Sequence, residues 1–152
     1  MLLYWVALAL LAADQVSKVL IVNRLPAGET IPLVPHIFHL TAVRNTGIAF
    51  GLFQQHPAFL TALIGFCVVL LCFFSLRLSR AHLLEKAAYG LILGGAVGNL
   101  IDRVRFGWVI DFLDFRVWPV FNLADSGITV GVILFAWKIF FSHETSKRTS
   151  SH

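Results

Sequence analysis

The 152-residue chain is 58% hydrophobic, only 13% charged, and carries a formal net charge of +4, with a mean hydropathy of +0.81. One small core could not bury so much apolar surface, so the composition excludes a soluble globular protein. It predicts an integral membrane protein whose residues 1–152 form a single domain. The basic residues form no stripe interleaved with aromatic residues, which argues against a nucleic-acid partner and favours signals of membrane orientation.

The first predicted membrane span covers residues 2–22 and contains two charged side chains. Asp14 and Lys18 lie four residues apart, so a helix places both on the same face. A charge at membrane depth is costly and normally faces the protein interior, where it marks function. The pair is therefore either part of a functional site or a structural ion pair between helices, and the sequence alone leaves both open.

Residues 23–57 differ from a membrane span because proline and glycine interrupt several short apolar runs. We predict extended strands near residues 31–34 and 37–41, followed by a short amphipathic helix, in a small extracytoplasmic subdomain. His36 and His39 would point to opposite faces of a strand, so we expect no metal site and no cofactor.

Three further segments complete a predicted bundle of four transmembrane helices. Residues 58–76 contain no charge, residues 87–104 are rich in small residues that allow close helix packing, and residues 121–141 form the last span. Residues 105–120 connect the last two spans, and the polar tail at residues 142–152 is expected to be disordered. The predicted fold class is an all-α membrane protein with a small β-containing subdomain.

Four spans place both termini on one side of the membrane, and the positions of Lys and Arg predict which side it is. Basic residues gather in the loop between the second and third spans and after the last span: Arg77, Arg80, Lys86, Lys138, Lys147 and Arg148. Both termini are therefore predicted to be cytoplasmic. The connections at 23–57 and 105–120 are then extracytoplasmic, although they too contain arginines.

This topology brings four acids toward one polar pocket at the outer membrane boundary: Asp14, Asp102, Asp111 and Asp125. Two carboxylates close together cannot both ionise cheaply, so they share a proton, and one can act as a base while the other acts as an acid. An aspartic protease uses this chemistry to activate water and to protonate the scissile carbonyl. Spacing leaves Asp102 and Asp111 as rivals for one role, and an ion pair with Arg103 could consume Asp102.

Two other function classes are compatible with polar groups inside a membrane protein. A small proton-coupled transporter would need a polar route through both leaflets, but the inner halves of the predicted spans are apolar apart from Lys138. A structural assembly partner would explain the small residues of the third span but not a shared acid pocket. Proteolysis is therefore the favoured hypothesis.

Five motifs occur in order over nearly the whole chain. They are Asp14-Gln15-Val16-Ser17-Lys18, Arg44-Asn45-Thr46-Gly47-Ile48-Ala49-Phe50, Gly94 through Arg103, Val109-Ile110-Asp111-Phe112 and Phe121-Asn122-Leu123-Ala124-Asp125. Together they resemble the motifs of bacterial lipoprotein signal peptidase, the type II signal peptidase. The resemblance implies a four-helix inner-membrane aspartyl endopeptidase. We expect its active site to lie at the extracytoplasmic face and the enzyme to be a monomer. Its substrate would be a prolipoprotein, cut just before the diacylglyceryl-modified cysteine.

The resemblance also implies roles for single residues. Asp111 and Asp125 would form the catalytic pair, and Asp114 would be a solvated charge. The substrate-binding or supporting residues would be Asp14, Lys18, Asn45, Asn99, Arg103 and Asn122. Within this set, Asn99 and Asn122 would orient the acids or the peptide, and Asn45 and Arg103 would hold the substrate backbone.

Overall fold

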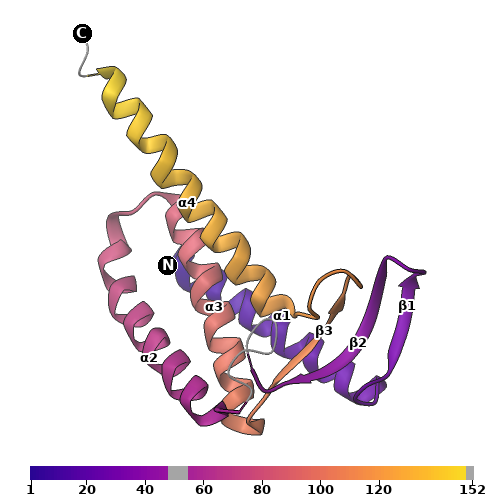
Figure 1. The fold of residues 1–152 in the computed structure, drawn as a ribbon. Helices are drawn as coiled ribbons and strands as arrows, with labels where there is room; N and C mark the ends of the chain where they lie inside the picture. The colour runs from indigo at the N-terminus through magenta and orange to yellow at the C-terminus, as the bar shows by residue number, and fades with distance from the viewer. Residues whose placement is uncertain (48–54, 150–152) are drawn as a thin grey trace.

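The computed structural model describes residues 1–47 and 55–149. Its elements, in chain order, are α1 (Leu2–Arg24), β1 (Thr30–Val34), β2 (Phe38–Asn45), α2 (Pro57–Ser75), the 3₁₀ helix η2 (Leu76–Arg80), α3 (Leu83–Phe106), β3 (Val109–Asp114) and α4 (Leu123–Thr149). The four α-helices pack as a bundle, and the three strands form a sheet at one end of it (Figure 1).

The four predicted spans correspond to the four α-helices. Three helical segments are long and apolar enough to cross a membrane: Leu2–Arg24, Pro57–Leu78 and Leu123–Phe140. The 24 residues of α3 would extend ~36 Å at ~1.5 Å per residue, but charged side chains lower its hydropathy. A mostly helical membrane protein is therefore confirmed, whereas a membrane span at α3 stays a prediction.

α3 lies at the centre of the bundle, in contact with α1, α2 and α4. Its glycines allow this close approach. A Cβ atom at Gly94 would collide with the carbonyl oxygen of Ala7 in α1, and one at Gly95 would collide with the carbonyl oxygen of Ala124 in α4. Because other helices surround α3, its polar side chains can face protein instead of lipid, and a low hydropathy is compatible with its position.

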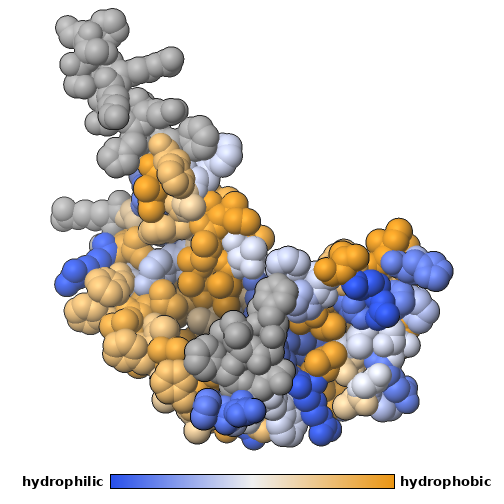
Figure 2. Space-filling model, viewed as in Figure 1, coloured by the Kyte–Doolittle hydropathy of each residue, from blue (hydrophilic) through white to orange (hydrophobic). Residues whose placement is uncertain are grey.

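The outer surface of the bundle is apolar. Phe66 and Val69 of α2 are 61% and 66% exposed, and Ile133 of α4 is 59% exposed. In Figure 2, hydrophobic side chains cover the helical part of the molecule, and hydrophilic ones gather toward the sheet. A surface of this kind is stable in contact with lipid, because the hydrocarbon of the bilayer is an apolar solvent and water is not.

The sheet has the strand order β1-β2-β3, and both of its pairings are antiparallel. The two strands predicted within residues 23–57 are confirmed as β1 and β2. The third strand is a correction, because the sequence analysis treats residues 105–120 only as a connection. β3 pairs with β2 so that Val43 lies opposite Asp111 and Asn45 lies opposite Val109. Its partner lies far earlier in the chain, so local sequence patterns do not reveal the pairing.

Two further expectations concern segments near the ends of elements. The predicted amphipathic helix falls mainly on residues 48–54, which lie outside the described residues. The structure continues α4 through Thr149, and the expectation that residues 142–152 are disordered stays a prediction. Residues 142–149 contain no glycine or proline to end a helix, and they follow directly on a long one, so adding a turn requires no new nucleation.

Candidate active site

Polar side chains from β2, β3, α3 and α4 gather around one cavity at the sheet end of the bundle. The cavity has a volume of about 580 Å³. Its polar and charged lining residues are Arg44, Asn45, Asn99, Arg103, Asp111, Asp125 and Thr129. Both acids predicted to form the catalytic pair therefore lie on the same cavity, although they come from different elements.

Two asparagines connect these acids to each other. Asn122 Nδ2 donates a hydrogen bond to Asp111 Oδ1 (2.7 Å), and Asn99 Nδ2 donates one to Asp125 Oδ1 (2.8 Å). Asn122 Nδ2 also lies 3.1 Å from Asn99 Oδ1, so the two amides join in a chain. The predicted orienting role of Asn99 and Asn122 agrees with these contacts, because each amide fixes one carboxylate relative to the other.

The start of α4 holds Asp125 in place. The backbone N–H of Asp125 donates to Asn122 Oδ1 (2.9 Å), and the backbone N–H of Asn122 lies 3.3 Å from Asp125 Oδ2. This reciprocal arrangement has the geometry of a helix-capping box, in which two side chains satisfy backbone donors that the first turn leaves free. Asp125 therefore occupies the helix N-terminus, where the helix dipole stabilises a negative charge.

Asp111 lies on β3, outside the three candidate membrane spans, and is 1% exposed. Burial and the nearby charge of Asp125 raise the pKa of Asp111 to about 7, against the opposing effect of hydrogen bonds from Asn45 and Asn122. Asn45 Nδ2 donates to Asp111 Oδ2 at 2.8 Å. An acid with this pKa holds a proton in a substantial fraction of molecules at neutral pH, as a shared-proton carboxylate pair requires.

Behind the cavity lies a buried charge cluster of Asp14, Lys18 and Asp102. Lys18 Nζ lies 2.8 Å from Asp14 Oδ2 and 2.8 Å from Asp102 Oδ2. The side chains of all three residues are at most 1% exposed. Lys18 Nζ also donates to Asn99 Oδ1 (3.1 Å), which links the cluster to the acids on the cavity. Lys18 thus joins Asp14 on its own helix, α1, to Asp102 on α3.

Each carboxylate of this cluster also accepts a backbone hydrogen bond next to a predicted catalytic acid. Asp14 Oδ1 accepts from the N–H of Ala124 (3.0 Å), the residue before Asp125. Asp102 Oδ2 accepts from the N–H of Ile110 (3.2 Å), the residue before Asp111. Lys18 therefore connects two anions that hold the backbone immediately beside both acids.

The cluster corrects the expected arrangement of the four acids. Asp14 and Asp102 do not line the cavity that Asp111 and Asp125 share. The ion-pair partner of Asp102 is Lys18 and not Arg103 as the sequence analysis suggests. Consecutive residues on a helix point about 100° apart, so Asp102 and Arg103 face different neighbours. Asp102 is engaged by a cation, which leaves Asp111 as the acid that faces Asp125.

Asn45 and Arg103 lie on the cavity and also hold the end of β2. The Arg103 guanidinium donates to the carbonyl oxygen of Gly47. Asn45 Oδ1 accepts from the N–H of Gly47 (3.0 Å), while its amide nitrogen reaches Asp111. Asn45 therefore connects a predicted catalytic acid with the chain that leaves the sheet, a role that its place in the sequence did not reveal.

Asp114 is not the solvated charge that the sequence analysis expects. Its side chain is 6% exposed and lies 3.0 Å from the Arg116 guanidinium. It also accepts hydrogen bonds from the hydroxyl of Thr41 (2.7 Å) and the N–H of Arg116 (2.8 Å). Burial opposes ionisation, but these contacts outweigh it and lower the pKa of Asp114. Asp114 fastens β3 to β2 and to the turn that follows.

Gln15 is a site residue that sequence reasoning missed. Its Nε2 atom donates to Asp102 Oδ1 (3.0 Å) and lies 3.2 Å from Asp14 Oδ2. It therefore binds the Asp102 oxygen that Lys18 leaves free, and at Asp14 it shares the oxygen that pairs with Lys18. Its position between the charged residues of an otherwise apolar helix was the available signal, since an amide at that depth needs buried partners.

A family model described as Signal peptidase (SPase) II matches residues 6–141. The chain belongs to the signal peptidase II family. A lipoprotein signal peptidase of Halothermothrix orenii is 41% identical over 140 residues, which cover 90% of this chain and 96% of the relative. Another, from Moorella thermoacetica, is 44% identical over 134 residues, which cover 88% and 89% of the two chains.

The fold agrees with that of solved membrane enzymes. A bacterial membrane enzyme solved by the in meso method at 2.3 Å resolution superposes with a TM-score of 0.83 at 31% identity, covering 93% of this chain and 88% of its own. Signal peptidase II membership confirms the hypothesis of a bacterial membrane protease that removes signal peptides from prolipoproteins. The transporter alternative is not supported.

The buried cluster predicts a large cost for removing its cation. Lys18→Met leaves two buried carboxylates without a counter-ion and should lower the free energy of unfolding by about 3–5 kcal/mol. Lys138→Met is a matched control, because Lys138 pairs with Glu85 where the two side chains are 27% and 18% exposed, and it should cost about 0–1 kcal/mol. Denaturation of the purified proteins in detergent measures both. Equal losses for the two variants would contradict the structural role of Lys18.

Proposed function

We propose that this signal peptidase II is an aspartic endopeptidase in which Asp111 and Asp125 form the catalytic pair. The observation that carries the proposal is that both carboxylates line one cavity and are joined through the amides of Asn99 and Asn122. The substrate class is a prolipoprotein, and the cleaved bond is the one just before the diacylglyceryl-modified cysteine.

In the proposed mechanism the two carboxyl groups share one proton. Asp125 is the anionic member, because the helix N-terminus and the Asn99 amide favour its charge, and Asp111 holds the proton. Asp125 takes a proton from a water molecule, whose oxygen attacks the scissile carbonyl carbon while Asp111 protonates the carbonyl oxygen. The tetrahedral intermediate collapses when the proton on Asp125 passes to the leaving nitrogen and a hydroxyl proton returns to Asp111.

The polar residues around the pair would position the substrate. Arg103 and Asn45 have donor groups on the cavity, and a peptide backbone offers the carbonyl oxygens that such groups bind. The cavity also has apolar lining from Ile64 of α2 and Ile128 of α4, which suits the apolar side chains of a signal peptide. Two acyl chains on the substrate would hold the cleavage point at the membrane boundary, since each buried methylene adds ~0.8 kcal/mol of membrane affinity.

The catalytic assignment predicts which carboxyl substitutions stop the reaction. Asp111→Asn and Asp125→Asn should each reduce cleavage of a lipid-modified prolipoprotein by several orders of magnitude while the protein remains folded, because either change removes the shared-proton chemistry. Asp114→Asn is the matched control on the same strand and should keep most of the activity while weakening the sheet. If Asp111→Asn kept activity and Asp102→Asn folded but lost it, the assignment would pass to Asp102.

The hydrogen bond from Asn45 predicts a shift in the pH profile. Because this bond stabilises ionised Asp111, Asn45→Ala should raise the pKa of Asp111 further above about 7. The shared proton would then be lost at higher pH, so the alkaline limb of the pH profile of kcat/KM should shift to higher pH. Asn23→Ala, an exposed asparagine at the end of α1, should leave the limb unchanged. If the alkaline limb of Asn45→Ala stayed at the same pH or shifted to lower pH, the proton-donor role of Asp111 would be contradicted.

The proposed membrane placement has both termini in the cytoplasm and the active site at the extracytoplasmic face. In a background without Cys67 and Cys72, a cysteine replacing Glu29 should react with a membrane-impermeant thiol reagent added to intact cells. A cysteine replacing Leu83, at the start of α3, should react only after the cells are opened. The reverse labelling pattern would overturn the orientation, while the catalytic assignment would stand.

A further inference from the structure

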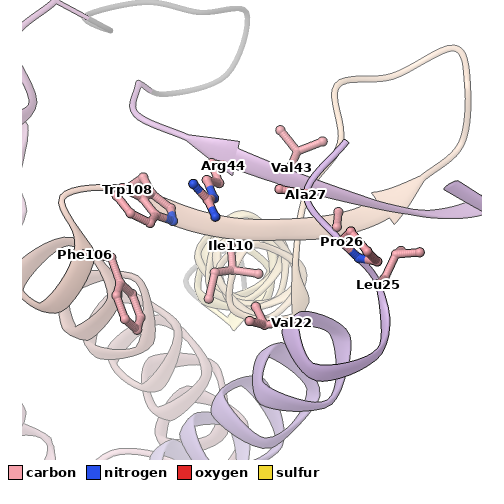
Figure 3. A pocket seen from close by; sticks show the side chains of 10 residues that line it. Val22, Leu25, Pro26, Ala27, Val43, Arg44, Phe106, Trp108 and Ile110 are labelled. Atoms are coloured by element: carbon pink, nitrogen blue, oxygen red, sulfur yellow. The ribbon is translucent and has the colours of Figure 1, made fainter. Parts of the chain in front are cut away.

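A second cavity, of about 370 Å³, lies beside the sheet and shares only Val43 and Arg44 with the described lining of the acid cavity. Figure 3 shows it between β2 and β3 above and the ends of two helices below. Val22 comes from the last turn of α1, Phe106 is the last residue of α3, and Ile110 belongs to β3. Ile110 precedes Asp111, and successive side chains of a strand point to opposite faces. The second cavity therefore lies behind the strand that carries Asp111.

The lining of this cavity is apolar except for one cation. Among the described residues that line it, Arg44 is the only charged one. Its guanidinium carbon lies 5.0 Å from the centre of the Trp108 ring, and Figure 3 shows the two side chains next to each other. Among the described side chains, no carboxylate forms an ion pair with Arg44. The stacked guanidinium retains donors at its edge that an anion can accept.

The position of the cavity decides which anions can reach it. Val22 lies close to the end of Leu2–Arg24, one of the candidate membrane spans, so the cavity is at the level where that helix leaves the bilayer. Trp108 is of the residue type enriched at membrane interfaces. At that level a phosphate group and the first methylenes of acyl chains occur together in one molecule, the phospholipid.

We propose that this cavity is a binding site for a membrane phospholipid. The phosphate accepts paired hydrogen bonds from Arg44, and the proximal part of an acyl chain packs on Val22, Phe106 and Ile110. Its volume falls in the ~300–1,000 Å³ range typical of ligand sites and fits part of a lipid, whose remaining chain stays in the bilayer. Arg44 lines both cavities, but the proposed lipid lies on the face of β3 opposite Asp111, and the proposal does not depend on the catalytic assignment.

A lipid in this site would support the catalytic strands from behind. Ile110 is adjacent to Asp111 on β3, and Arg44 is adjacent to Asn45 on β2. Filling the cavity would restrict the movement of both strands relative to α1 and α3, because a packed apolar contact resists displacement.

The test measures lipid retention directly and does not use enzyme activity. The full-length protein, delipidated in detergent, is titrated with dioleoylphosphatidylglycerol and observed by native mass spectrometry. One lipid should bind more tightly than the rest, and Arg44→Gln should weaken that binding about tenfold or more. The matched control is Arg77→Gln, because Arg77 also stacks on aromatic rings, Phe73 and Phe74, but lines none of the cavities described above.

A second pair of variants tests the apolar part of the site. Val22→Trp fills the cavity from α1 and should abolish the tight binding, whereas Val16→Trp places the same bulk on another exposed position of that helix and should not. Circular dichroism without added lipid establishes that each variant is folded.

Two further ligands identify what the site recognises. Inorganic phosphate at millimolar concentration should not displace the lipid, and dioleoylglycerol, which lacks the phosphate, should not bind tightly. Displacement by phosphate would reduce the cavity to a simple anion site, and equal binding of dioleoylglycerol would exclude recognition of the phosphate. Equal retention by the Arg44 and Arg77 variants would show ordinary surface lipid. Each of these outcomes would overturn the proposal.

Discussion

The structure depends on the buried ammonium group of Lys18, which lies between the carboxylates of Asp14 and Asp102. Removing charges from water is so costly that such a group is stable only when its partners are complete. Here the two carboxylates have a second task, since each accepts a backbone N–H beside one of the acids on the cavity. The same two carboxylates therefore balance the charge inside the bundle and hold the backbone that spaces the acids on the cavity.

This arrangement separates four acids into two chemical types. Asp14 and Asp102 neutralise a cation and have no surface on the cavity. Asp111 and Asp125 instead receive hydrogen bonds from neutral amides. An amide orients a carboxylate without cancelling its charge, so these two acids still interact electrostatically and can exchange a proton. Under the proposed function, identical side chains thus serve stability in one place and catalysis in another because their partners differ.

The sheet explains how a small helical protein builds a site from distant segments. β3 places Asp111 against the cavity on one side and Ile110 against an apolar cavity on the other. Its pairing with β2 adds Asn45 to the acid side, while Asp114 fastens the far end of the strand. A short strand alternating between two environments can therefore connect a polar active site with the surrounding lipid.

The sequence by itself determined that this is a membrane protease of the signal peptidase II family. Predominantly apolar stretches of about 20 residues indicate membrane helices whatever their neighbours are, because the thickness of the bilayer fixes the length required. The ordered motifs identified the family and the residues of the proposed site. Only the tertiary structure decided how these residues are grouped: Lys18 with Asp102, Asp114 with Thr41, and β3 with β2. Local sequence contains no information on such groupings, because their free energy arises from contacts between segments that folding alone brings together.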